Sequence, residues 1–176
     1  MISFIGNRPA LQVGRYQVFD YDPAWLDDAL LRAAKAADQN DFPFVEEIRC
    51  GVMQYLENAC SLRLMDIKEL FEKVRKMLVK IGCEHIAEQL RPLSPPLTVS
   101  LIHAAKEAGT GYELAFFEKL RAELEELRDH GVEKIRFTEV RESVLILRST
   151  AKWDKRCEAV LREVEAFLSS WEKTAA

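Results

Sequence analysis

The chain has 176 residues, of which 48% are apolar and 31% are charged, and its net charge at pH 7 is −4. This balance excludes a disordered chain and is typical of one globular domain or of two small ones. The excess of acidic residues argues against nucleic-acid binding, which needs a basic surface, and no apolar run approaches the roughly 18 residues of a membrane span.

The first part of the chain predicts a β-hairpin followed by helices. Ile2–Ile5 and Tyr16–Phe19 are rich in β-forming residues, and glycine, proline and asparagine stand between them. Apolar residues then recur every three and four positions, which is the spacing of amphipathic helices. The helices predicted in this way span residues 22–37, 41–59, 66–81 and 84–90. The third is the clearest, because Asp66 and Glu69 form a capping box and Gly82 can end the helix.

The second part follows a segment that contains three prolines in five residues, Pro92–Pro96. Proline cannot continue a helix, so we predict a Pro-rich linker over residues 92–98. The helices predicted after it span residues 99–108, 110–130 and 153–171. Thr110 is the expected cap of the second of these. Ile135–Phe137 and Val144–Leu147 have the spacing or composition of strands, which predicts a second hairpin.

Together these elements predict a predominantly helical α+β protein. An N-terminal β-hairpin plus helical bundle covers residues 1–91, the linker covers 92–98, and a helix–β-hairpin–helix region covers 99–176. The last helix has an apolar stripe that must be covered. We expect the chain's own hairpin and preceding helix to cover it, with Trp171 as the residue best placed to reach a partner.

The sequence contains no catalytic or metal-binding pattern that we recognise. Its histidines and cysteines lack the spacing of metal ligands. These residues are His85, His103, His130, Cys50, Cys60, Cys83 and Cys157. We therefore predict no catalytic residue, no metal site, and reduced thiols in a cytoplasmic protein.

Two other patterns could bind phosphate, and each has a simpler interpretation. Gly109–Gly111 looks like a fragment of a phosphate-binding loop, but helix termination and capping account for it. Lys73, Lys76 and Lys80 form a basic stripe that could receive phosphates or the acidic surface of a partner. Because this stripe lies opposite a regular apolar stripe, a solvated helix face is the more typical interpretation.

The residues Gly14-Arg-Tyr-Gln-Val-Phe-Asp20, followed by Leu26 and Ala29-Leu30 in a helix, give a first match to a known family. A second match is the pattern of Ile67, Leu70, Val74 and Leu78 followed by Gly82. Over residues 10–91 the chain thereby resembles the ATP-cone domain, a strand hairpin ahead of a small helical bundle that binds adenine nucleotides as an allosteric signal.

The resemblance implies that ATP or dATP is a regulatory ligand. It further implies nucleotide contacts by Arg8 and Arg15 at the phosphates and by an aromatic residue, Phe19, near the base. The family has a Lys-Arg pair just before the hairpin glycine, where this chain has Gln12 and Val13. Arg8 and Arg15 are the nearest bases.

These observations favour a non-catalytic ligand-sensing or interaction protein, with an adenine nucleotide as the candidate ligand. The alternative is a homo-oligomeric scaffold or a partner-binding protein without a small ligand. A third class, an enzyme whose active-site residues are far apart in the sequence, is also compatible, because convergent side chains leave no linear pattern. A deep polar pocket would favour the enzyme, and an exposed apolar patch would favour the scaffold.

Overall fold

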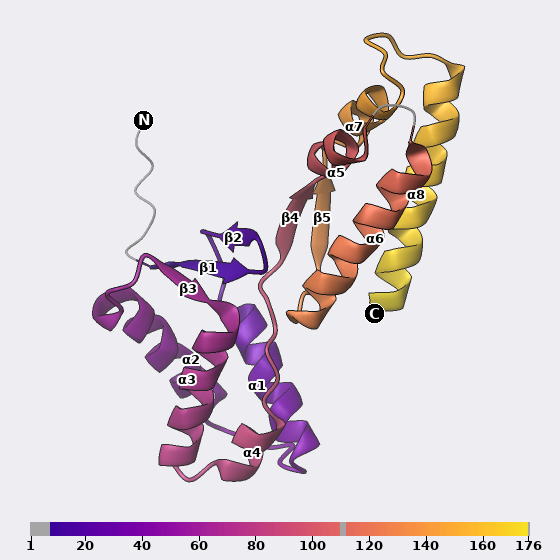
Figure 1. Ribbon diagram of the computed structural model, residues 1–176. Helices are drawn as coiled ribbons and strands as arrows, with labels where there is room; N and C mark the ends of the chain where they lie inside the picture. The colour runs from indigo at the N-terminus through magenta and orange to yellow at the C-terminus, as the bar shows by residue number, and fades with distance from the viewer. Residues whose placement is uncertain (1–7, 110–111, 176) are drawn as a thin grey trace. The chain divides into compact units, whose positions relative to one another are not determined.

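The computed structural model describes residues 8–109 and 112–175 (Figure 1). Helices make up 61% of it and strands 11%, which confirms the predominantly helical α+β class. The chain divides into two compact units. The N-terminal unit comprises Met1–Pro95 with His130–Val132, and the C-terminal unit comprises Pro96–Asp129 with Glu133–Ala176. In the described part of the chain, no helix is long and apolar enough to cross a membrane.

The N-terminal unit contains a three-stranded sheet. Its strands are β1 (Ala10–Val13), β2 (Tyr16–Val18) and β3 (Leu64–Asp66), in the order β2-β1-β3. β1 and β2 are antiparallel, and the turn between them includes Gly14, whose φ of +59° suits glycine. β3 runs parallel to β1 and contributes a fully buried side chain, Met65.

The predicted N-terminal hairpin is confirmed, with a different first strand. The observed strand is β1, whereas the strand predicted at residues 2–5 lies outside the described residues. β1 buries Leu11 and Val13 completely, and Gln12 between them faces its neighbour Gln17 on β2. This alternation of buried and polar positions is what a strand with one covered face requires.

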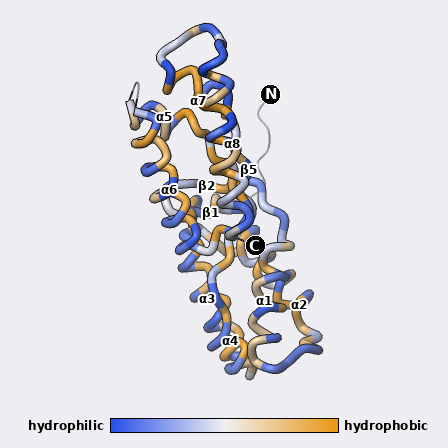
Figure 2. Tube along the Cα trace, turned by 90° about the vertical axis from the view of Figure 1, so that its right-hand side faces the viewer, coloured by the Kyte–Doolittle hydropathy of each residue, from blue (hydrophilic) through white to orange (hydrophobic). Residues whose placement is uncertain are grey.

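The helices of the N-terminal unit follow the predicted pattern closely. They are α1 (Ala24–Ala36), α2 (Val45–Gln54), the π-helix η1 (Tyr55–Ala59), α3 (Ile67–Lys80) and α4 (Glu84–Gln89). α3 begins as predicted, because the Asp66 side chain accepts a hydrogen bond of 2.8 Å from the Lys68 backbone N–H. It ends before Gly82, whose φ is +83°. Figure 2 shows hydrophobic and hydrophilic positions alternating along α3.

The core of this unit lies where α1, α3 and α4 pack together. Phe71 of α3 is fully buried, and its ring centroid lies 5.8 Å from that of Trp25 on α1. Arg75 holds the end of α4 from α3, since it donates hydrogen bonds of 3.2 Å to the Ala87 carbonyl and 2.9 Å to the Leu90 carbonyl. Burying each large apolar side chain stabilises the fold by about 1.5–3 kcal/mol.

The segment after α4 packs against a distant glycine. Leu93 and Ser94 are buried, and the Ser94 backbone N–H donates a 2.9 Å hydrogen bond to the Gly131 carbonyl. Gly131 has a φ of +87°, and a Cβ there would lie 2.8 Å from the Pro92 carbonyl carbon and closer still to its oxygen. Glycine is therefore required at position 131 by both its conformation and this close approach.

The C-terminal unit is a two-stranded parallel sheet with helices. It contains β4 (Leu97–Ser100), α5 (Leu101–Ala108), α6 (Glu113–Asp129), β5 (Ile135–Thr138), α7 (Val140–Leu147) and α8 (Lys155–Ala175). In the sheet Leu97 lies opposite Ile135, and Val99 lies opposite Phe137. Figure 1 shows α6 and α8 side by side along one face of this sheet.

The hairpin predicted in this unit is wrong. Residues 135–138 do form a strand, but it pairs with β4, which precedes it by almost forty residues, and it runs parallel. Residues 144–147 belong to α7, which packs against α5 and buries Ser143, Val144 and Leu147. A short continuous apolar run has no period that distinguishes a buried strand from a buried helix, which explains the error.

The predicted linker is shorter than expected. Residues 92–96 form no regular element, but Leu97 and Thr98 already belong to β4. The helix predicted from residue 99 begins after Ser100, whose hydroxyl caps α5 by accepting a hydrogen bond from the Ile102 backbone N–H. The predicted cap at Thr110 lies outside the described residues.

The apolar stripe of α8 is covered within its own unit. Phe167 lies 5.4 Å from Phe117 of α6 between ring centroids, and Trp171 lies 6.2 Å from Phe137 of β5. The Arg128 guanidinium stands 5.5 Å from the Trp171 ring. With 8% of its surface exposed, Trp171 belongs to the core of this unit, so the prediction that the chain itself covers the stripe is confirmed. A contact of Trp171 with a partner stays a prediction.

Candidate functional site

Arg8, the first predicted phosphate contact, is tied to a carboxylate. Its Nε donates a 2.7 Å hydrogen bond to Glu57 Oε1 in η1, and its Nη1 donates a 3.3 Å bond to the Tyr21 carbonyl. The guanidinium also stands 5.9 Å from the centroid of the Tyr21 ring. Arg8 thus links the start of the hairpin to η1, and its charge is matched by Glu57.

Arg15 and Phe19 lie at opposite ends of β2. Arg15 occupies the hairpin turn, with its guanidinium 5.7 Å from the Tyr16 ring. Phe19 follows β2 and is 51% exposed. The three residues of β2 lie between them, so four Cα-to-Cα steps separate Arg15 and Phe19 by about 13 Å.

Tyr21 has a structural role beside Arg8. It is buried, its hydroxyl donates a 2.9 Å hydrogen bond to the Pro9 carbonyl, and its ring contacts Trp25 edge-on. Burial raises the pKa of the Tyr21 phenol to about 12, although the Arg8 guanidinium opposes this rise. The phenol therefore stays protonated at neutral pH and serves as a hydrogen-bond donor.

A groove runs between α2 and α3 in the N-terminal unit. It consists of two adjoining hollows of about 300 and 390 Å³ that share Met77. The first is lined by Gly51, Val52, Tyr55, Leu70, Lys73, Val74 and Met77. The second is lined by Phe44, Glu47, Ile48, Met77, Ile81 and Cys83. We call the two together the α2–α3 groove.

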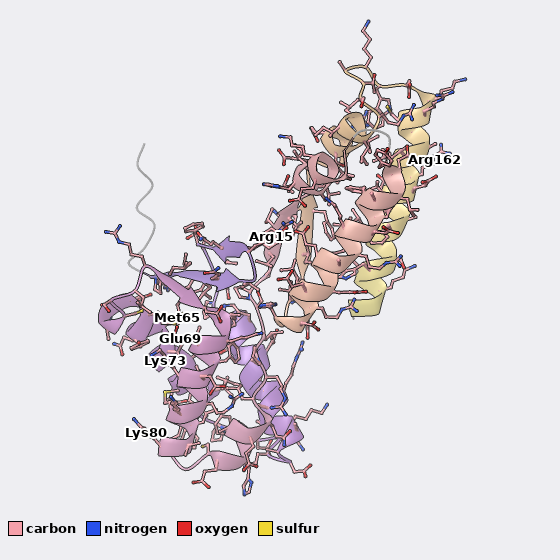
Figure 3. All side chains as sticks on the ribbon, in the orientation of Figure 1. Arg15, Met65, Glu69, Lys73, Lys80 and Arg162 are labelled. Atoms are coloured by element: carbon pink, nitrogen blue, oxygen red, sulfur yellow. The ribbon has the colours of Figure 1, made fainter. Side chains whose placement is uncertain are left out.

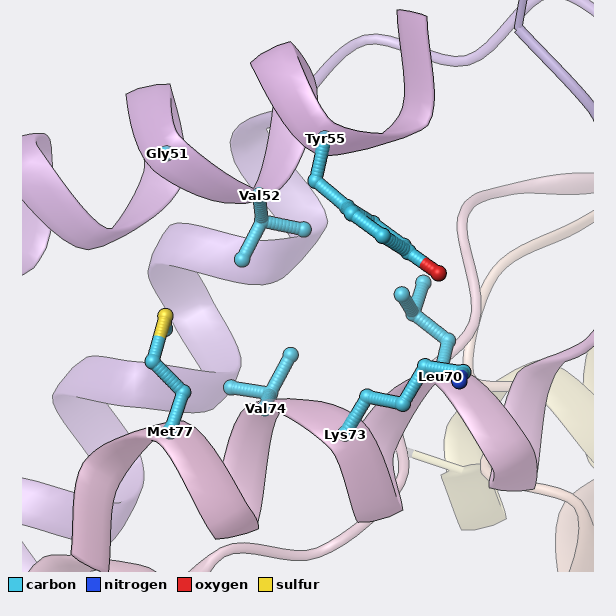
Figure 4. Close-up of a pocket in the computed structure, with 7 residues that line it drawn as sticks. All are labelled: Gly51, Val52, Tyr55, Leu70, Lys73, Val74 and Met77. Carbon is cyan, nitrogen blue, oxygen red and sulfur yellow. The ribbon is translucent and has the colours of Figure 1, made fainter. Parts of the chain in front are cut away.

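Figure 4 shows how the first hollow is built. Val74 and Met77 project upward from α3, and Val52 projects down from α2, so that these side chains form an apolar floor. Tyr55, the first residue of η1, reaches down toward Leu70. The end of α2 faces the start of α3, whereas in the second hollow the start of α2 faces the end of α3. The two helices are therefore antiparallel.

Apolar side chains are exposed at both ends of this groove. Tyr55 is 36% exposed at one end, and Phe44 and Ile81 are 51% and 52% exposed at the other. Tyr55 begins η1, in which the Cys60 backbone N–H donates a 2.9 Å bond to the Tyr55 carbonyl, five residues earlier. Such π-turns are rare and occur frequently at functional sites.

Gly51 gives the α2 wall an open stretch. It lies inside α2 and lines the first hollow, and Figure 4 shows no side chain from it in the gap. A Cβ at this position would meet no atom of residues 8–109 or 112–175 within 4 Å. The fold of this unit therefore leaves space for a side chain there.

Lys73 lines the groove from α3, and Lys76 and Lys80 lie on the same side of this helix without lining either hollow. Figure 3 shows Glu69, Lys73 and Lys80 along the same side of α3, and Lys76 lies one turn from both lysines. All three lysines are exposed. Lys73 makes a loose ion pair with Glu69, in which the ammonium nitrogen and the carboxylate oxygen are 3.9 Å apart. About half of the Glu69 side chain is exposed to solvent. On the α2 side the carboxylate is Glu47.

None of the residues of this groove was predicted as a ligand contact from the sequence, although Lys73 belongs to the lysine stripe described above as a possible site for phosphates or an acidic partner. The missed signal was Gly51, a glycine inside a helical pattern, which costs stability and often has a packing or functional reason. Comparison of the chain with protein families, curated proteins and solved structures found no match. Among the described residues no group of three or more metal-ligating side chains comes together.

Proposed function

We propose that this chain is a non-catalytic ligand-sensing or interaction module whose N-terminal unit binds its ligand in the α2–α3 groove. The observation that carries the proposal is a groove with an apolar floor that is open to solvent, with Tyr55 at one end and Lys73 on its α3 side. Binding sites are typically concave, mostly apolar, and supplied with a few polar groups that orient the ligand.

The groove lining supports a binding role more than a catalytic one. The first hollow offers one ammonium, Lys73, and one phenol, Tyr55, as its ionisable groups. The second adds Glu47 and Cys83. These four groups are spread over both hollows of an otherwise apolar lining, which is the composition of a binding site with a few orienting polar groups.

Filling the groove should exclude a dye that binds in it. We expect 1-anilinonaphthalene-8-sulfonate, a flat apolar anion that fluoresces on apolar surfaces, to bind the folded protein beside Tyr55 and Lys73. Gly51→Leu should lower the emission severalfold, because the new side chain would occupy the groove. Folding should be preserved, since glycine inside a helix is about 0.5–1 kcal/mol less favourable than alanine. Dye titration and circular dichroism measure the two effects.

The control for this experiment is Gln54→Leu. It adds the same side chain at an exposed position of α2 that does not line either hollow, so the dye should bind as in the unaltered protein. Equal emission from the unaltered protein and Gly51→Leu would contradict the proposal, because the dye would then bind elsewhere.

An adenine nucleotide is the first small ligand to test, as the resemblance to the ATP-cone domain implies. What supports it here is the combination of the Tyr55 ring, on which a flat base can stack, and the Lys73 ammonium, which can meet a phosphate. A nucleotide at 100 times its dissociation constant should stabilise the N-terminal unit by about 2.7 kcal/mol. Thermal melting with millimolar ATP, dATP and ADP measures this.

Two matched variants locate such a nucleotide. Loss of the melting shift in Lys73→Gln would place the phosphates in the α2–α3 groove, whereas loss in Arg15→Gln would place them at the hairpin turn. If no nucleotide shifts the melting of the unaltered protein, the nucleotide proposal fails and the groove proposal is left to the dye experiment.

A further inference from the structure

We infer that the α2–α3 groove receives an amphipathic helix of a partner protein, with acidic residues along the flank that faces α3. This inference rests on the proposed function, because it names the kind of ligand that the same groove binds. Its basis is the length of the groove, the open position at Gly51, and the charge of the α3 lysines.

The dimensions of the groove fit a short helix. It runs from Tyr55 opposite Leu70 to Phe44 near Ile81, which is roughly eleven residues along either helix. At 1.5 Å per residue this is about 16 Å, or three helical turns. A bound helix presents apolar anchors at spacings of three, four and seven residues, so successive anchors would enter the two hollows on either side of Met77.

Gly51 supplies room for a backbone to come close. Glycine is the costly choice inside a helix, and none of the described residues of this unit requires it, since α2 is helical there and a Cβ would meet none of their atoms within 4 Å. Glycine is used where a backbone or ligand must approach closely. The open position is therefore explained by what lies against α2 in the bound state.

The positive charges of the α3 lysines favour a partner helix that has acidic residues along one flank. Lys73 lines the groove and pairs loosely with Glu69, and Lys76 and Lys80 follow it at intervals of three and four along the same side of α3. Carboxylates spaced along one flank of a docked helix would meet these ammonium groups in sequence. Such complementarity favours the correct partner and penalises one with the opposite charge. Arg75 takes no part, because it binds the end of α4.

A helix fits this groove better than an extended segment. Both walls are helices, whose backbone groups are used internally, so they offer side chains and no strand edge for main-chain pairing. Specificity must therefore come from apolar anchors and the lysine charges, which is how helix-in-groove complexes are recognised.

The test uses two synthetic helical peptides that have the same apolar anchor residues. Each is about fifteen residues long, rich in alanine, with leucine or phenylalanine spaced at three and four residues. One has glutamates along a flank, and the other has lysines at the same positions. By fluorescence anisotropy against the full chain, we expect the acidic peptide to bind at least about tenfold more tightly, and Lys76→Glu with Lys80→Glu to reverse the preference.

Gly51→Ala separates binding from folding. Its melting temperature should rise slightly, because alanine is the better helix former, while its affinity for the acidic peptide should fall about tenfold. Equal binding of the two peptides, or unchanged binding by Gly51→Ala, would overturn the inference. If neither peptide binds while the dye still does, the inference of a partner helix fails and the proposed function stands. If neither the dye nor the peptides bind, the inference and the proposed function both fail.

A second copy of this chain is the competing occupant. Light scattering that shows a dimer in the unaltered protein and a monomer in Gly51→Ala would assign the groove to self-association and overturn the inference of a separate partner. A monomer in both proteins, with binding of the acidic peptide, is the result that we expect.

Discussion

Gly131→Ala should lower the free energy of unfolding of the N-terminal unit by about 3 kcal/mol. Alanine pays about 1–2 kcal/mol for the left-handed conformation that Gly131 adopts. Its Cβ would also collide with the Pro92 carbonyl, which is backbone and cannot rotate away. Shifts forced by overpacking cost about 1–3 kcal/mol more. Urea denaturation followed by circular dichroism measures the loss.

Gly82→Ala is the matched control for this change. Gly82 has nearly the same φ, +83° against +87°, but a Cβ there would meet no atom within 4 Å. It should therefore lose only the conformational part, about 1–2 kcal/mol. Equal losses in the two variants would show that the Pro92 contact does not constrain the protein, and would contradict the packing seen at Gly131.

Trp171→Glu should destabilise the C-terminal unit by at least about 3–5 kcal/mol, the usual loss when a large buried aromatic side chain is truncated. The indole contacts Phe137 and Arg128, and only 8% of its surface is exposed. The new carboxylate would have to be buried in its place, which adds to the loss. Thermal melting measures the destabilisation, and light scattering should show an unchanged mass.

Lys173→Glu is the control, since it introduces the same carboxylate two residues further along α8 at an exposed position. Its stability should change by no more than about 0.5 kcal/mol. If Trp171→Glu instead converted a dimer to a monomer with little change in melting, Trp171 would be an interface residue and the homo-oligomeric alternative would be favoured.

Residues that cap a helix allowed that helix to be predicted from the sequence. Asp66 and Gly82 delimit α3 because each acts on its own backbone neighbourhood, so a single sequence contains the information. The apolar spacing within α3 and α8 likewise identified their buried faces. A helix for which both the cap residues and the apolar spacing pointed to the same range, such as α3, was predicted correctly.

Pairings between distant segments could not be predicted. β5 pairs with β4 across α5 and α6, and the run at Val144 becomes helical because α5 covers it. β3 has three residues, too few to show a period. In each case tertiary contacts decide the conformation, and the local pattern is compatible with more than one outcome.

The candidate site was missed for the same reason. The α2–α3 groove combines residues from two helices that are adjacent in the fold but about twenty positions apart in the sequence. Arg8 looked like a free phosphate contact because Glu57, its partner, is 49 residues away. Gly51 and the lysine stripe that contains Lys73 were the local signs of the groove.

The π-helix η1 also affects how this chain should be aligned with others. A turn that closes from residue 60 back to residue 55 accommodates one more residue than an α-helical turn does. A relative with an unbroken α-helix here would therefore align only if a one-residue gap were opened between Tyr55 and Ala59. Without that gap, every residue from β3 to α4 would be aligned one position away from its true counterpart in the relative. The sequence identity of this segment would then be underestimated.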